Sequence, residues 1–186
     1  MDDLQLRDVC GRIYEKHKKA LDLIFENRID SRSKTISMIR TVLSEYKENG
    51  LVILDESKTN NSFIHFYTAK MDELMKPLEN CSSSWGDTHV YRFWFGNISD
   101  DAFNISFELG GLNVPEEQYY IQQTIINLKK PNDKRKEEFR YKRIYTQKFA
   151  ISLDETKDSL QKRISEALDK ILTWQDELIQ EIHKNV

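Results

Sequence analysis

Two stretches rich in aromatic and β-branched residues, 90–95 and 103–109, are separated by the turn-forming sequence GNISDD. Turn residues between two such runs are the usual mark of a β-hairpin. The first run carries large side chains on both of its faces, which predicts a central strand that is covered on both sides. In the second run polar residues alternate with four apolar ones that share a face: Phe103, Ile105, Phe107 and Leu109.

Periodicity and turn signals predict the remaining elements. We expect helices over residues 4–27, 30–49, 115–128 and 154–184, a short helix within 71–78, and strands over 51–54, 63–68 and 140–153. In the last of these strands Tyr141, Arg143 and Tyr145 occupy alternate positions. The order of elements predicts an α+β fold, in which an antiparallel sheet of about five strands packs against an N-terminal helical hairpin and a long C-terminal helix.

A length of 186 residues is enough for one domain with a substantial core. We expect a single α+β domain over 1–186, built from a helical hairpin (1–50), β-hairpins (51–112), a helix, basic connector and strand (113–153) and a long helix (154–186). Aromatic residues make up 11% of the chain, which argues against disorder. No apolar run approaches the length of a membrane span, and the acidic N-terminus lacks a secretory signal, so a cytoplasmic protein is expected.

Cys10 and Cys81 are the only cysteines. No histidine stands at metal-ligand spacing from either of them, so a structural zinc site is not expected. A disulfide is not expected in a reducing compartment either, and both residues are predicted to be free thiols. No cofactor and no metal are predicted.

Basic and aromatic residues are interleaved in residues 129–143, KKPNDKRKEEFRYKR. Clustered cations neutralise phosphates, and aromatic rings stack on unpaired bases, so this stretch is a candidate for contact with DNA or RNA. The alternative is a solvated connector between a helix and a strand, which is what most charged runs are. The candidate nucleic-acid-binding residues are Lys129, Lys130, Lys134, Arg135, Lys136, Arg140, Lys142 and Arg143.

Two histidines and several carboxylates lie near the predicted strand ends: His65, His89, Asp87, Asp100, Asp101 and Glu108. A metal site requires two or three of these side chains to converge, and separate surface or hydrogen-bonded residues are the favoured interpretation. Glu108, on the polar face of its strand, is the carboxylate to examine first if a pocket is present. Trp85, Trp94 and Trp174 are predicted to be core residues rather than a ligand platform.

Residues 155–157, Glu-Thr-Lys, match the ExK half of a nuclease motif. They stand at a predicted helix N-terminus, where acidic residues stabilise the helix dipole, so we interpret them as capping. Neither a GxSxG sequence nor a phosphate-binding glycine loop is present. No catalytic residue is predicted.

Several segments together resemble the C-terminal region of bacterial PD-(D/E)XK nuclease superfamily proteins. They are IYEKHKKALDLIFENR at 13–28, FYTAKMDELMKPL at 66–78, SSW at 83–85, NVPEE at 113–117 and the closing helix with Trp174. The resemblance covers nearly the whole chain. The catalytic signature of that family belongs to a half that this chain lacks, so the resemblance implies an accessory domain without the nuclease core.

Three functions follow as hypotheses. The first is a non-catalytic accessory or recognition domain of a nuclease system that contacts nucleic acid through residues 129–143, with the lysines of the first helix as a further candidate contact. The second is a protein-interaction module, such as a phage or mobile-element inhibitor of a host defence nuclease, whose partner would be a nuclease or defence protein, or a subunit that oligomerises through its helices. An additional apolar stripe on the final helix, beside Trp174, would favour it. The third is a divergent metal-dependent hydrolase that uses Glu108 with Asp101 or His89.

Overall fold

The computed structural model describes residues 3–26, 31–56, 59–79, 84–86, 88–130, 139–152 and 155–185. The chain forms two compact units, Met1–Asp30 and Ser31–Val186, and each is described by itself. The single domain expected over residues 1–186, and the hairpin expected within its first 50 residues, remain predictions. None of the helices in the described ranges is long and apolar enough to cross a membrane.

The first unit contains one helix, α1 (Asp3–Glu26). The helix is kinked at His17, where φ is −119° and ψ is 18°. Cys10 is an exposed free thiol, as predicted, whereas Cys81 lies outside the described residues. Considered by itself, α1 carries apolar side chains that its own unit does not cover, namely Leu4, Leu6, Ile13, Tyr14, Leu23 and Ile24.

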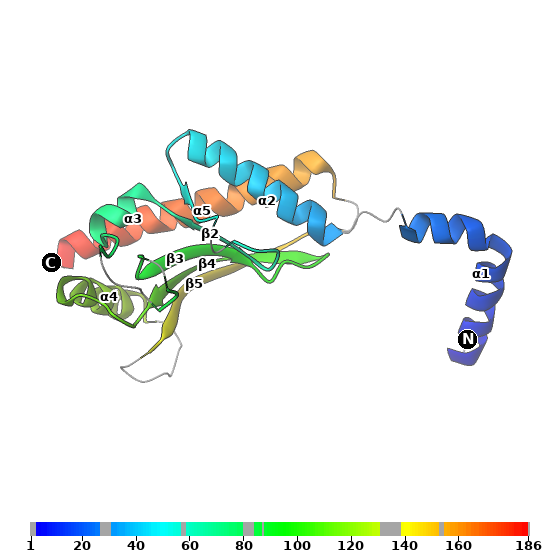
Figure 1. Cartoon of the computed structure of the whole chain (residues 1–186), viewed down its shortest axis with the longest axis horizontal. Helices are drawn as coiled ribbons and strands as arrows, with labels where there is room; N and C mark the ends of the chain where they lie inside the picture. Colours follow the sequence, from blue (N-terminus) through cyan, green and yellow to red (C-terminus); the bar gives the residue numbers. More distant parts are fainter. Residues whose placement is uncertain are drawn as a thin grey trace. The chain divides into compact units, whose positions relative to one another are not determined.

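The second unit contains the sheet and four helices (Figure 1). Each predicted strand and helix is present within a few residues of its expected bounds. The strands are β1 (Ile53–Leu54), β2 (Phe63–Tyr67), β3 (Tyr91–Gly96), β4 (Ala102–Gly110) and β5 (Tyr141–Ala150). The helices are α2 (Ser31–Glu48), α3 (Ala69–Leu74), α4 (Glu116–Lys129) and α5 (Lys157–Asn185).

The five strands follow one another in chain order, and all four neighbouring pairs are antiparallel. The predicted α+β fold is therefore confirmed. β3 is the middle strand, and all six of its residues are buried. Because successive side chains of a strand point to opposite faces, this burial shows that β3 is covered on both sides, as its sequence predicted.

Helices α2 and α5 pack side by side over one face of the sheet (Figure 1). Aromatic side chains fill the layer between these two helices and the sheet. They include Phe93 and Phe107, whose ring centroids lie 4.8 Å apart. Trp174 of α5 lies against Phe107, at 5.4 Å, and against Tyr145, at 4.8 Å. Trp174 is thus half-buried and packs against the core.

A hydrogen bond joins α2 to α5. The Tyr46 hydroxyl donates to Asp169 Oδ1 at 2.6 Å. Burial, together with this bond to a carboxylate, raises the pKa of Tyr46 to about 12 from its usual value of 10. The folded chain therefore favours the protonated phenol, and the stabilisation is complete below pH 10 and is lost as the pH rises toward 12.

We predict that Tyr46→Phe lowers the free energy of unfolding at neutral pH by about 1 kcal/mol, the usual contribution of one hydrogen bond. The variant should also lose less stability than the original chain between pH 10 and 12. Tyr119→Phe, at an exposed position on α4, is the matched control. Urea unfolding at several pH values measures both effects, and parallel pH profiles for all three chains would contradict the assignment.

Candidate functional site

The face of the sheet that points away from α5 carries polar and charged side chains. Phe107 contacts Trp174 of α5, so its neighbour Glu108 points to the opposite face. In the register of β3 with β4, Arg92 lies opposite Glu108 and Trp94 lies opposite Ser106. These four side chains therefore share one face, which we call the outer face of the sheet.

A β-bulge brings Arg143 to the outer face. Phe107 pairs with Tyr145, but the next residue, Glu108, pairs with Arg143, so that β5 has one extra residue at this point. Tyr145 packs on Trp174 of α5, whereas Arg143 lies over the ring of Trp94. Simple alternation along β5 would have put both side chains on one face, and the bulge separates them.

Two glycines provide flat surfaces on which indole rings rest. A Cβ atom at Gly96 would lie 2.3 Å from Cζ3 of Trp94, and a Cβ atom at Gly110 would lie 2.5 Å from Cζ3 of Trp85. Real Cβ atoms do not approach other atoms so closely, so each ring fills the space that a side chain would occupy. Glycine inside a strand often marks such a close approach.

Each of the two indoles is covered by a guanidinium group. Cζ of Arg92 lies 4.6 Å from the ring of Trp85, and Cζ of Arg143 lies 4.7 Å from the ring of Trp94. Trp85 also stacks on Tyr141, with centroids 5.3 Å apart and planes inclined by 29°. Arginine suits this arrangement because its planar cation binds to aromatic faces through the ring quadrupole.

One carboxylate lies among these cations. Glu108 is the direct cross-strand neighbour of Arg92, and its Oε1 lies 3.9 Å from an Nη atom of Arg143. The Glu108 side chain retains 17% of its accessible surface and that of Arg143 retains 44%. The row that crosses β3, β4 and β5 therefore contains two cations and one anion, all at least partly shielded from water.

These side chains surround a cavity of about 290 Å³ on the outer face. Phe63 and His65 of β2 complete its lining. The volume is near the lower end of the range typical for small-molecule sites, and the combination of aromatic walls with a few polar groups is also typical of such sites. We call this cavity the outer-face cavity.

Trp94 also carries an unusual buried polar atom. Its side chain is only 3% exposed, and within the described part of the chain no hydrogen-bond acceptor contacts its Nε1 atom. A buried N–H without an acceptor costs free energy, and buried tryptophans usually find a partner.

The eight predicted nucleic-acid-binding residues differ in their surroundings. Arg143 lines the cavity, and Arg140 lies over the Tyr141 ring at 5.2 Å. Lys129 forms an ion pair of 2.5 Å with Glu181, and Lys142 is buried against Phe139. Lys130 is the left-handed C-cap of α4. Lys134, Arg135 and Lys136 lie outside the described residues.

The histidines and carboxylates that were considered for a metal site are dispersed. His65 and Glu108 both line the outer-face cavity, but Asp101 precedes β4 and is about 23 Å from Glu108 along the strand. Asp87 lies outside the described residues. Among the described ranges, no group of three histidine, cysteine, aspartate or glutamate side chains is placed to hold a metal ion.

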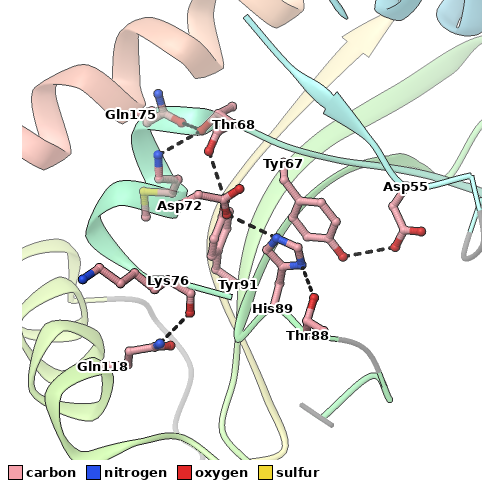
Figure 2. Close-up of polar contacts among 11 residues, drawn as sticks. Asp55, Tyr67, Thr68, Asp72, Lys76, Thr88, His89, Tyr91, Gln118 and Gln175 are labelled. Atoms are coloured by element: carbon pink, nitrogen blue, oxygen red, sulfur yellow. Dashed lines mark hydrogen bonds and ion pairs between the residues drawn. The ribbon is translucent and has the colours of Figure 1, made fainter. Parts of the chain in front are cut away.

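His89, which lies just before β3, belongs to a separate hydrogen-bonded network (Figure 2). Asp72 of α3 accepts a hydrogen bond from the Tyr91 hydroxyl at 2.6 Å and lies 3.2 Å from His89 Nε2. The His89 ring stacks on Tyr67 with centroids 3.7 Å apart. Burial, and then the charge of Asp72, raise the pKa of Tyr91 well above its usual value. The network fastens α3 to β2 and β3.

Among the residues of the cavity, Arg143 and Glu108 are candidates from the sequence, whereas Arg92, Trp85 and Trp94 are not. The two tryptophans were expected in the core, and although Trp94 is almost fully buried, both line the cavity. The sequence Trp94-Phe95-Gly96 contains a signal for the position of the Trp94 ring. Gly96 stands two residues after Trp94 and therefore lies beside it on the same face of the strand, where it leaves space for the ring.

Comparisons with protein-family models, with curated proteins and with solved structures found no match to this chain. The resemblance to the C-terminal region of PD-(D/E)XK nuclease superfamily proteins therefore stays a prediction.

We predict that Gly110→Ala displaces the Trp85 ring, because the new Cβ atom would overlap it. Overpacking of this kind costs about 1–3 kcal/mol of stability. The displacement should move an indole N–H signal in a nitrogen–proton correlation spectrum. Gly11→Ala is the control, since nothing lies within 4 Å of its new Cβ atom. Unchanged indole signals in Gly110→Ala would show that Trp85 does not rest on Gly110.

Proposed function

We propose that this chain is a non-catalytic recognition domain that binds single-stranded nucleic acid on the outer face of its sheet. The observation that carries the proposal is the presence of two guanidinium–indole pairs, Arg92–Trp85 and Arg143–Trp94, beside one cavity. In these pairs Arg143 is accessible to a phosphate, whereas the faces of both indoles are already covered, so bases must stack on neighbouring rings.

Guanidinium groups neutralise backbone phosphates, and aromatic rings stack on bases whose faces are free. Half-buried Tyr141 and exposed Phe63 offer such rings at the cavity. Sheet faces that carry aromatic residues are a common platform for single strands, whereas a duplex hides the faces of its bases. A single-stranded ligand is therefore favoured over a double-stranded one.

We further propose that the domain assists a nuclease of the PD-(D/E)XK kind. This part rests on the sequence resemblance alone. The nuclease core would stand elsewhere in a longer protein or in a separate chain, and the domain would hold the nucleic acid near it.

We predict that Arg143→Gln weakens binding of a labelled single-stranded oligonucleotide by about tenfold at low salt, because one charged contact is lost. The slope of log affinity against log salt should also fall. Lys47→Gln, which removes a charge at an exposed position of α2, is the matched control. A triple neutralisation of Lys134, Arg135 and Lys136 tests separately whether the connector contributes.

Titration of single-stranded DNA and RNA by fluorescence anisotropy at two salt concentrations provides the measurement. Absence of binding at low salt would rule out the proposal. Equal loss of affinity in Arg143→Gln and Lys47→Gln would instead show that binding depends on overall charge and not on the outer face.

A second candidate function is a protein-interaction module, and α1 supplies the observation in its favour. Leu4, Leu23 and Ile24 are 77%, 61% and 61% exposed, and an apolar helix surface of this kind is typical of docking to another protein. The partner would be a nuclease or defence protein with an apolar groove that receives the helix.

We predict that Ile13→Glu abolishes capture of such a partner by the immobilised chain, because a charge would enter an apolar contact. Binding of oligonucleotides should stay unchanged in this variant, since the outer face is intact. Arg12→Glu, at the neighbouring polar position, is the control. Retained capture by Ile13→Glu would exclude α1 as the docking surface.

A further inference from the structure

The two edges of the sheet differ in length. β1 forms one edge and has only two residues, whereas β5 forms the other edge and has ten. A short edge strand offers few free backbone groups, and a long one is a ready template on which another strand can pair. Of the two edges, β5 is the one with the length to hold a further strand.

The register of β5 with β4 shows which backbone groups of β5 point away from the sheet. The N–H of Ile151 donates to the carbonyl oxygen of Asp101 at 2.6 Å, in continuation of this register. Such bonds join every second pair of an antiparallel ladder, so every second residue before Ile151, back to the bulge, also bonds to β4. The residues between them are Thr146, Lys148 and Ala150, and their N–H and C=O groups point outward.

No described residue occupies these outward groups. All three residues are exposed, and within the described ranges the backbone of residues 145–150 bonds to no element except β4. The bulge comes before this segment, and all six of its residues stay in register with β4. The outward N–H and C=O groups thus form one regular row. An extended peptide backbone matches such a row, whereas a nucleic-acid backbone has no amide groups with which to do so.

The strand is also strongly basic. Residues 139–150 include four lysines and arginines and no aspartate or glutamate. Lys148 lies on the outer face, two residues after the partner of Ser106. On the other side of the sheet, Lys170 of α5 lies over the ring of Phe149 at 5.3 Å. Cations therefore flank the free edge on both faces of the sheet.

Charge distinguishes between the partners that match this row. Among the described residues no carboxylate forms an ion pair with Lys148. The hydrogen bond from Ser99, and to a lesser extent the charge of Lys148, lower the pKa of Asp101. A second copy of the chain would bring another basic strand to the edge, and like charges across a ladder are destabilising. A strand that carries carboxylates gains attraction instead, so charge favours an acidic segment over a second copy.

We infer that β5 binds an acidic segment of a partner protein, which pairs antiparallel with residues 145–150 and extends the sheet. Residues directly opposite each other in such a ladder share a face, so the acidic side chains of the segment stand beside Lys148 on the outer face. Apolar side chains alternate with them on the side of α5, beside half-buried Tyr145. Backbone hydrogen bonds supply the affinity in this mode of recognition, and alternate side chains supply the selectivity. The inference does not depend on the nucleic-acid binding proposed above.

The probe is a fluorescently labelled peptide of four valines and four glutamates in alternation. We expect it to bind the full chain at low salt, measured by fluorescence anisotropy. The matching peptide of valine and lysine should bind about tenfold more weakly, because its cations would stand opposite Lys148. Equal binding of the two peptides, or no binding of the acidic one, would overturn the inference.

Methylation of the peptide backbone tests strand pairing directly. In the antiparallel arrangement the N–H groups of the glutamates face β5 and those of the valines face solvent. N-methylation of the glutamates should therefore abolish binding, whereas N-methylation of the valines should leave it unchanged. The two methylated peptides have the same side chains and the same number of methyl groups. Equal affinities, or a loss of binding in the valine-methylated peptide alone, would overturn the inference.

Lys148→Glu tests the residue itself. It should weaken binding of the acidic peptide about fivefold, because a like charge replaces an opposite one across the ladder. Lys47→Glu, at an exposed position of α2, is the matched control and should bind as the original chain does. If Lys148→Glu does not fold, the methylated peptides with the unaltered chain still decide the matter. Undiminished binding in folded Lys148→Glu would overturn the inference.

Two further outcomes would assign the edge to another partner. If Lys148→Glu weakens binding of a single-stranded oligonucleotide but not of the peptide, the edge contacts nucleic acid, and the inference is overturned. If the chain forms dimers in sedimentation velocity experiments and does not bind the peptide, the edge pairs with a second copy, and the inference is overturned as well.

Discussion

The second unit depends on the burial of β3 on both of its faces. One face contributes Tyr91, Phe93 and Phe95 to the aromatic layer beneath α2 and α5, and all three are fully buried. The other face contributes Arg92 and Trp94, which are also nearly inaccessible to water. Apolar burial stabilises the first face at about 25 cal/mol per Å². The second face contains the charged side chain of Arg92, and apolar burial does not explain how that charge is stabilised.

Burial of a guanidinium group is costly unless its charge is compensated. Arg92 obtains this compensation from two directions, since Glu108 lies opposite it on β4 and the Trp85 ring covers its planar face. Arginine tolerates such a position better than lysine would, because its charge is delocalised and more weakly hydrated. The loop that carries Trp85 is held in turn by Tyr141, whose hydroxyl donates to the carbonyl oxygen of Ser84. The cavity and the strand order are therefore maintained by the same contacts.

The sequence was sufficient for the elements of the fold, because strand alternation and helix periodicity depend on neighbouring residues. The central position of β3 followed from the large side chains on both of its faces. The cavity could not be predicted in the same way. Its residues come from four strands and a loop, and the position of Arg143 depends on a bulge opposite Phe107 and Glu108 that no local pattern marks. The kink of α1 at His17 likewise has no proline or glycine at that position to signal it.

The net charge of the chain affects how the proposed ligand would bind. The chain carries a net charge of −3, so long-range attraction does not draw nucleic acid to it. Any affinity must come from short-range contacts at the outer face, where Arg143 is exposed and Arg92 is nearly inaccessible to water. Such contacts release few counterions, and stacking on aromatic rings is little affected by salt. Binding of this kind discriminates by the shape and hydrogen-bonding edge of a base more than by the density of phosphates, which suits recognition of a single strand better than non-specific retention of a duplex.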